Sequence, residues 1–111
     1  MIDLFGSGDP NEWGTYVLWD RDPEHPMKVG LSGCPRRRVL GIRKAVPWPI
    51  EIVLVVPLDL EVEFWQRFEK AELPYEMKHG GWTEWYLDPA LVALVNRAAW
   101  QSAMPPVAVA A

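Results

Sequence analysis

The sequence has few of the features that mark secreted or membrane proteins. It contains one cysteine, Cys34, so an intrachain disulfide is excluded. Its longest apolar runs, such as IVLVVPL, are far shorter than the roughly 20 residues that cross a bilayer. The N-terminus lacks the basic start and apolar run of a signal peptide. We therefore expect an intracellular, cytoplasmic protein with no membrane partner.

Histidines and recognition motifs are also scarce. His25 and His79 have no second ligand at a recognisable spacing, which argues against a structural zinc site. The chain has no internal repeat, and it shows no zinc-finger or helix-turn-helix pattern from which a DNA sequence preference could be read.

The chain does contain enough apolar material for one core. Half of its 111 residues are hydrophobic, and seven are tryptophans. The net charge of −4 is unevenly distributed along the sequence. Residues 28–44 hold six basic side chains and no acidic one, whereas residues 51–88 hold nine acidic side chains and three basic ones. This distribution predicts a basic face on an otherwise acidic molecule.

The hydrophobic pattern predicts alternating strands and helices. Residues 14–20 and 27–32 read as a hairpin of two strands, and the apolar spacing of three and four after Pro35 predicts a helix that the PWP of residues 47–49 ends. The β-branched run at residues 50–58 predicts a central strand covered on both faces. Asp59 should cap a helix over residues 60–73, residues 82–87 form a short aromatic strand, and a last helix begins with Asp88 as its cap.

These elements predict an α/β (α+β) fold. Its order is β-β-α-β-α-β-α, with a small, mainly antiparallel three-stranded sheet flanked by helices. We assign residues 1–13 to an N-terminal extension, residues 14–101 to a single domain and residues 102–111 to a flexible C-terminal tail.

The joint order of several short motifs resembles the GIY-YIG nuclease superfamily. Gly14-Thr15-Tyr16 on the first strand, Lys28-Val29-Gly30 on the second, an arginine eight positions later and a glutamate on the helix after the next strand follow the family order. The likeness runs from about residue 14 to residue 87. It is to the small phage and bacterial branch, in which the second motif commonly reads Lys-Ile-Gly. This sequence departs from the branch at Thr15, which replaces isoleucine, and at Trp65, where histidine is frequent.

The resemblance implies a metal-dependent DNA endonuclease or nickase. By that likeness Tyr16 would activate the nucleophile, Arg38 would bind the scissile phosphate, and Glu61 would hold Mg²⁺ or Mn²⁺, while Lys28 could add a phosphate contact. Further contacts to nucleic acid are expected from the basic stretch and the turn before it, at Ser32, Arg36, Arg37, Arg43 and Lys44. Glu84, in the short aromatic strand, resembles the Glu-Trp-Phe element of the family, and two alternatives stay open: it rims the site, or it pairs with a neighbouring arginine.

Each of these residues also has a simpler interpretation. Tyr16 could be a core aromatic, and the three consecutive arginines could be a solvated helix start, although their charge there opposes the helix dipole. Glu61 and Glu63 both occupy a first helical turn, where acids are favoured for structural reasons, so Glu63 stays as the alternative metal ligand. Among the tryptophans, Trp48 is the candidate for stacking on bases.

Two other functions remain open from the sequence. A catalytically inactive binding module would keep the basic face without cleaving DNA, and the replacement of the second tyrosine by Lys28 favours it. A regulatory protein-interaction adaptor, which could be a homodimer, would use the acidic and aromatic C-terminal half. The form of the nucleic acid, whether duplex, branched, single-stranded or RNA, cannot be read from these residues.

Overall fold

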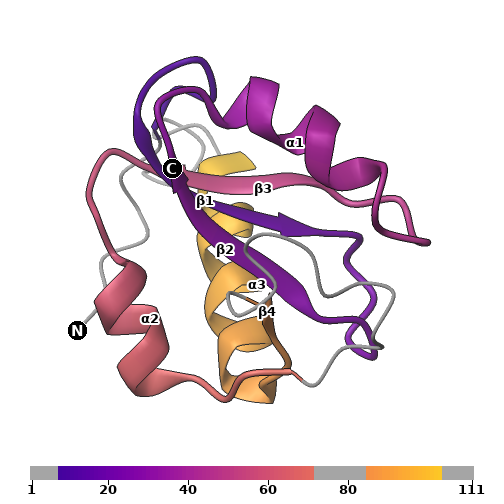
Figure 1. Ribbon diagram of the computed structural model, residues 1–111. Helices are drawn as coiled ribbons and strands as arrows, with labels where there is room; N and C mark the ends of the chain where they lie inside the picture. The colour runs from indigo at the N-terminus through magenta and orange to yellow at the C-terminus, as the bar shows by residue number, and fades with distance from the viewer. Residues whose placement is uncertain (1–7, 72–84, 104–111) are drawn as a thin grey trace.

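The computed structural model describes residues 8–71 and 85–103. In chain order its elements are β1 (Gly14–Trp19), β2 (Met27–Ser32), α1 (Pro35–Arg43), β3 (Glu51–Val56), α2 (Glu61–Arg67), β4 (Trp85–Tyr86) and α3 (Pro89–Ala103). The order β-β-α-β-α-β-α agrees with the sequence-based expectation, and the fold is α+β (Figure 1). None of the described helices is long and apolar enough to cross a membrane.

The sheet has four strands, in the order β3-β1-β2-β4, and every neighbouring pair is antiparallel. The expectation of three strands was therefore wrong, because the two-residue β4 pairs with the start of β2 through Met27 and Lys28. The expectation that residues 50–58 form a central strand was also wrong, since β3 lies at the edge of the sheet. The apolar run of β3 is continuous because both faces of this strand are packed against apolar side chains, although only one of its edges pairs with another strand.

Side chains of the sheet alternate between two apolar layers. The layer on the α1 side contains Tyr16, Leu18, Val39, Ile50 and Val55. The opposite layer receives α2 and α3 and includes Val17, Trp19, Met27, Val29, Leu54, Val56, Phe64, Leu91 and Val95. Figure 1 shows α1 above the sheet, α3 behind it and α2 at the lower left. This division fixes which strand residues can face the basic helix.

Helix α2 is shorter than the sequence indicated. It ends at Arg67, because Phe68 adopts an extended backbone and packs against the second apolar layer. The chain then runs beside β4, where the Ala71 amide donates to the Trp85 carbonyl at 2.9 Å. The N-cap is Leu60 rather than Asp59, although the Asp59 carboxylate still accepts from the Glu61 amide at 3.2 Å.

The other two helices, α1 and α3, begin at the expected local signals. Pro35 occupies the first turn of α1, as expected. Asp88 accepts from the Ala90 amide at 2.9 Å just before α3 begins with Pro89. Residues preceding β1 are also tied to the domain, because the Arg36 amide donates to the Pro10 carbonyl at 2.8 Å. Local signals thus fix the starts of α1 and α3, whereas α1 ends at Arg43, before the PWP of residues 47–49 that was expected to end it.

Candidate functional site

Tyr16 lies against Gly30 on the α1 side of the sheet. The two residues face each other across the β1–β2 pair, and directly opposed residues project to the same face. A Cβ atom built on Gly30 would lie 2.6 Å from Cζ of Tyr16 and closer still to its hydroxyl oxygen. The glycine is therefore required for the ring to occupy this position. Tyr16 itself is only 1% exposed.

Lys28 lies on the same face, two residues before Gly30. It is opposite Leu18, which makes it a diagonal cross-strand neighbour of Tyr16, at a separation that long side chains bridge. Its exposed fraction is 1%. Burial of an ammonium group is costly, so packing alone is a poor reason for a lysine at this position.

The arginines expected to bind phosphate are exposed on α1. Arg36, Arg37 and Arg38 are all exposed, whereas the following Val39 is buried, so the helix faces the sheet through Val39. Among residues 8–71 and 85–103, no acidic side chain forms an ion pair with any of the three. Arg38 lies four positions before the half-buried Ile42, on the side of α1 nearest the sheet.

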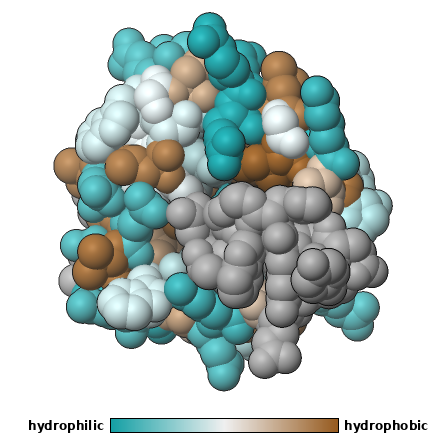
Figure 2. All heavy atoms as spheres, viewed as in Figure 1, coloured by the Kyte–Doolittle hydropathy of each residue, from teal (hydrophilic) through white to brown (hydrophobic). Residues whose placement is uncertain are grey.

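The remaining basic residues extend this face along the helix. Arg43 follows Arg36 by seven positions and Lys44 follows Arg37 by seven, which places each pair on one line of the helix surface. Arg43 and Lys44 are exposed, and Nε of Arg43 donates to the Ile50 carbonyl at 3.0 Å. Figure 2 shows hydrophilic side chains gathered over the upper part of the molecule, where Figure 1 places α1. We call the side chains of Arg36, Arg37, Arg38, Arg43 and Lys44 the basic face.

Ser32 has a local structural role. Its Oγ accepts a hydrogen bond of 3.0 Å from the Cys34 amide in the turn between β2 and α1. The side chain is half-buried and shapes the turn that starts the basic helix. To contact nucleic acid as well, the Ser32 hydroxyl would have to donate to it while still accepting this bond.

Glu61 is the first residue of α2 and is half-buried, whereas Glu63 is exposed. The start of α2 is fixed to β1 by Thr15, whose hydroxyl donates to the Leu58 carbonyl at 2.6 Å and accepts from the Leu60 amide at 2.9 Å. Within the described residues, Glu61 is not part of any group of three or more candidate metal ligands. A single carboxylate suits Mg²⁺ that keeps several waters and also binds substrate phosphate.

The strand register brings the starts of α1 and α2 to the same end of the sheet. Gly14 is opposite Ser32, and Thr15 is opposite Val56. Helix α1 begins three residues after β2 ends, and α2 begins five residues after β3 ends. The basic face and Glu61 therefore start from the same end of the sheet, while Tyr16 lies two residues into β1 from that end.

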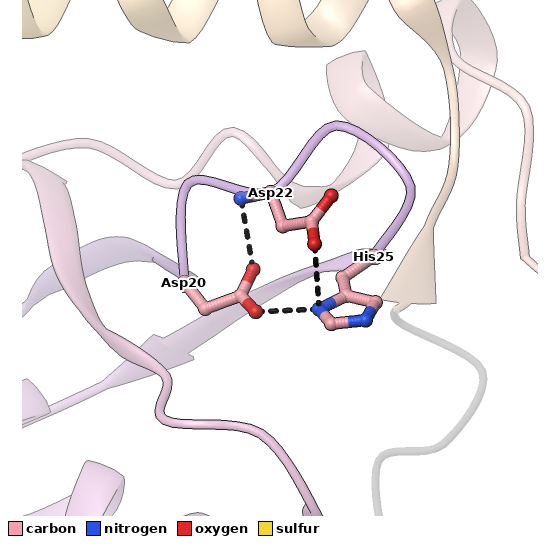
Figure 3. Close-up of side chains that lie close together, drawn as sticks. All are labelled: Asp20, Asp22 and His25. Carbon is pink, nitrogen blue, oxygen red and sulfur yellow. Dashed lines mark hydrogen bonds and ion pairs between the residues drawn. The ribbon is translucent and has the colours of Figure 1, made fainter.

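A group of residues that the sequence analysis set aside lies in the β1–β2 loop. One ligand atom from each of Asp20, Asp22 and His25 lies within 4.8 Å of those of the other two. Nδ1 of His25 is 2.5 Å from Oδ2 of Asp20 and 3.8 Å from Oδ2 of Asp22 (Figure 3). The hydrogen bond to Asp20 raises the pKa of His25, and the nearby carboxylate charges add to this effect against a smaller opposing effect of burial.

His25, for which the sequence indicated no second metal ligand, therefore has two candidate ligands beside it. The signal was present as Asp-x-Asp-x-x-His, but its spacing matches no common zinc motif, and only the loop conformation brings the three side chains together. His79 and Glu84 lie outside the described residues.

Trp48, the candidate for base stacking, already stacks on a protein ring. Its ring lies 4.6 Å from that of His25, with 18° between the planes, and meets Trp85 edge-on. The face of Trp48 that contacts His25 is therefore not available to a base.

Trp65, which stands where the resembled branch often has histidine, is 60% exposed, and Lys70 lies over its ring.

Comparisons with protein-family models, with curated proteins and with solved structures found no match to this chain.

Proposed function

We propose that the protein is a metal-dependent DNA endonuclease or nickase of the GIY-YIG type. The observation that carries the proposal is the packing of Tyr16 on Gly30, with Lys28 on the same face and the basic helix above it. This arrangement gives the exposed arginines of α1 a function that packing alone does not supply.

In this proposal each residue has one task in phosphodiester hydrolysis. Tyr16, acting as its phenolate, accepts a proton from the attacking water or hydroxyl. The oxygen of that nucleophile bonds to phosphorus as the ester P–O bond breaks and the leaving oxygen departs as an alkoxide. Arg38 binds the phosphate oxygens, for which the planar guanidinium is well matched, and the other residues of the basic face hold the flanking backbone. Mg²⁺ or Mn²⁺ at Glu61 would offset the charge that develops on phosphate and on the leaving oxygen.

The direct test is cleavage of supercoiled plasmid in the presence of Mg²⁺ or Mn²⁺. We expect the wild-type protein to nick or linearise the plasmid and Glu61→Ala, Tyr16→Phe and Arg38→Ala to lose this activity. Glu63→Ala is the matched control, because it removes an exposed carboxylate two residues along the same helix. Loss of activity in Glu63→Ala but not in Glu61→Ala would show that Glu63, not Glu61, is the metal ligand.

A non-catalytic nucleic-acid-binding module is the second candidate. The burial of Tyr16 and Lys28, each 1% exposed, favours it, because neither can meet a DNA phosphate without a movement of the surrounding side chains. This function predicts salt-sensitive DNA binding that the basic face supplies, with no cleavage by any divalent ion. The absence of cleavage on plasmid, branched and single-stranded DNA, together with such binding, would replace the nuclease proposal with this one.

A further inference from the structure

The β1–β2 loop contains a carboxylate whose side chain is largely removed from solvent. The Asp20 side chain is only 6% exposed. Among the described residues, no lysine or arginine pairs with Asp20 or Asp22. Arg21, which lies between them in the sequence, pairs with Glu51 instead, at 3.3 Å. A buried carboxylate is stable when a cation or hydrogen-bond donors compensate it.

The partner of this carboxylate is the imidazole of His25. Nδ1 of His25 faces both Asp20 and Asp22, as Figure 3 shows. The stack on Trp48 holds the ring from one side. When the imidazole is neutral, two carboxylates surround one nitrogen and the group carries a formal charge of −2. This charge favours a cation at the point where the three side chains meet.

The backbone of the loop holds the side chains in this arrangement. The Asp22 amide donates to Oδ1 of Asp20 at 3.0 Å, so that Oδ2 is left for His25. The Asp22 carbonyl accepts from Nε1 of Trp19 and from the His25 amide, each at 2.9 Å. Because these bonds exist before any ligand binds, little ordering would be needed on binding.

We propose that the β1–β2 loop is a binding site for a divalent transition metal ion. Its ligands are carboxylate oxygens of Asp20 and Asp22 and Nδ1 of His25. One imidazole and two carboxylates match the preferences of Zn²⁺ or Mn²⁺ better than those of Mg²⁺, which favours oxygen ligands alone. His25 and Asp22 are 35% and 45% exposed, so water can complete the coordination.

The site needs a small adjustment to take the ion. Metal–ligand bonds of about 2.0–2.2 Å separate neighbouring ligand atoms by roughly 3 Å or more. Nδ1 of His25 and Oδ2 of Asp20 are joined at present by a hydrogen bond of 2.5 Å, whose proton lies between them. Replacement of that proton by the ion would open this pair by less than about 1 Å and draw Asp22 inward from 3.8 Å.

Calorimetric titration of the metal-free full-length protein with ZnCl₂ tests the proposal, and CoCl₂ absorption spectra report on the coordination. We expect one ion per chain and a loss of affinity of at least about 10-fold in both His25→Asn and Asp22→Asn. Circular dichroism of each variant shows whether it is folded. The Asp22 side chain is more exposed than that of His25, so Asp22→Asn is expected to disturb the fold less.

Three variants exclude other sites in the same experiment. His79→Asn and Cys34→Ser remove the other histidine and the thiol, and Glu61→Gln removes the ligand assigned to the proposed nuclease, so all three should bind Zn²⁺ like the wild type. The proposal is overturned if no ion binds, or if folded His25→Asn and Asp22→Asn bind it as the wild type does. It is also overturned if His79→Asn or Cys34→Ser abolishes binding. The result does not depend on plasmid cleavage.

Discussion

Replacement of Gly30 by alanine tests the packing on which the proposed active site depends. The added Cβ would lie 2.6 Å from Cζ of Tyr16, whereas carbon atoms in contact prefer about 3.5–4.0 Å. The ring must therefore move by about 1 Å. Tyr16 is buried among Leu18, Val39, Ile50 and Val55, so this movement is resisted on all sides. Overpacking of this kind costs about 1–3 kcal/mol of unfolding free energy.

Gly41→Ala is the matched control for this experiment. The same added atom finds nothing within 4 Å on α1, where alanine is a better helix former than glycine by about 0.5–1 kcal/mol. Urea unfolding followed by tryptophan fluorescence should therefore show Gly30→Ala destabilised and Gly41→Ala stabilised. Equal stability of Gly30→Ala and the wild type would refute the packing of Tyr16 on Gly30. If the nuclease proposal is right, displacement of Tyr16 by about 1 Å should also reduce cleavage about 100-fold.

Three further predictions concern α2, the β1–β2 loop and the basic face. Thr15→Val removes the hydroxyl that links β1 to the start of α2, so urea unfolding should show a loss of about 1–3 kcal/mol that Thr15→Ser largely restores; no loss would contradict the two hydrogen bonds. In chelator-treated protein, the raised pKa of His25 means that its pair with Asp20 stabilises the fold fully below about pH 6.5 and progressively less as pH rises through the folded-state pKa. Unfolding of the wild type and of His25→Asn between pH 5.5 and 8.5 should show this pH dependence only in the wild type. If the unfolding free energy of the wild type instead rose relative to that of His25→Asn as pH increased, the inferred direction of the pKa shift would be wrong. Arg36→Ala and Arg37→Ala should each weaken DNA binding and reduce the slope of log K against log salt by about 0.9 if each contacts one phosphate, whereas Arg67→Ala at the end of α2 should not.

Sequence alone determined the features that depend on near neighbours along the chain. The hairpin strands, the start of α1 at Pro35 and the cap of α3 at Asp88 follow from local periodicity and from backbone groups within four residues. The uneven charge likewise predicted that the basic side chains of α1 would be exposed, because no acidic residue lies near them in the sequence.

Tertiary structure decided everything that depends on residues distant in the sequence. The apolar run of β3 reads the same in a central strand and in an edge strand covered by helices, so only the pairing with β1 reveals its place. The early end of α2 follows from the bridge between Lys70 and Tyr86, sixteen positions apart. The burial of Tyr16 and Lys28 likewise requires a strand register that the local sequence pattern does not encode. Asp20 and His25 are only five positions apart, but their meeting depends on a loop conformation that the same pattern leaves open.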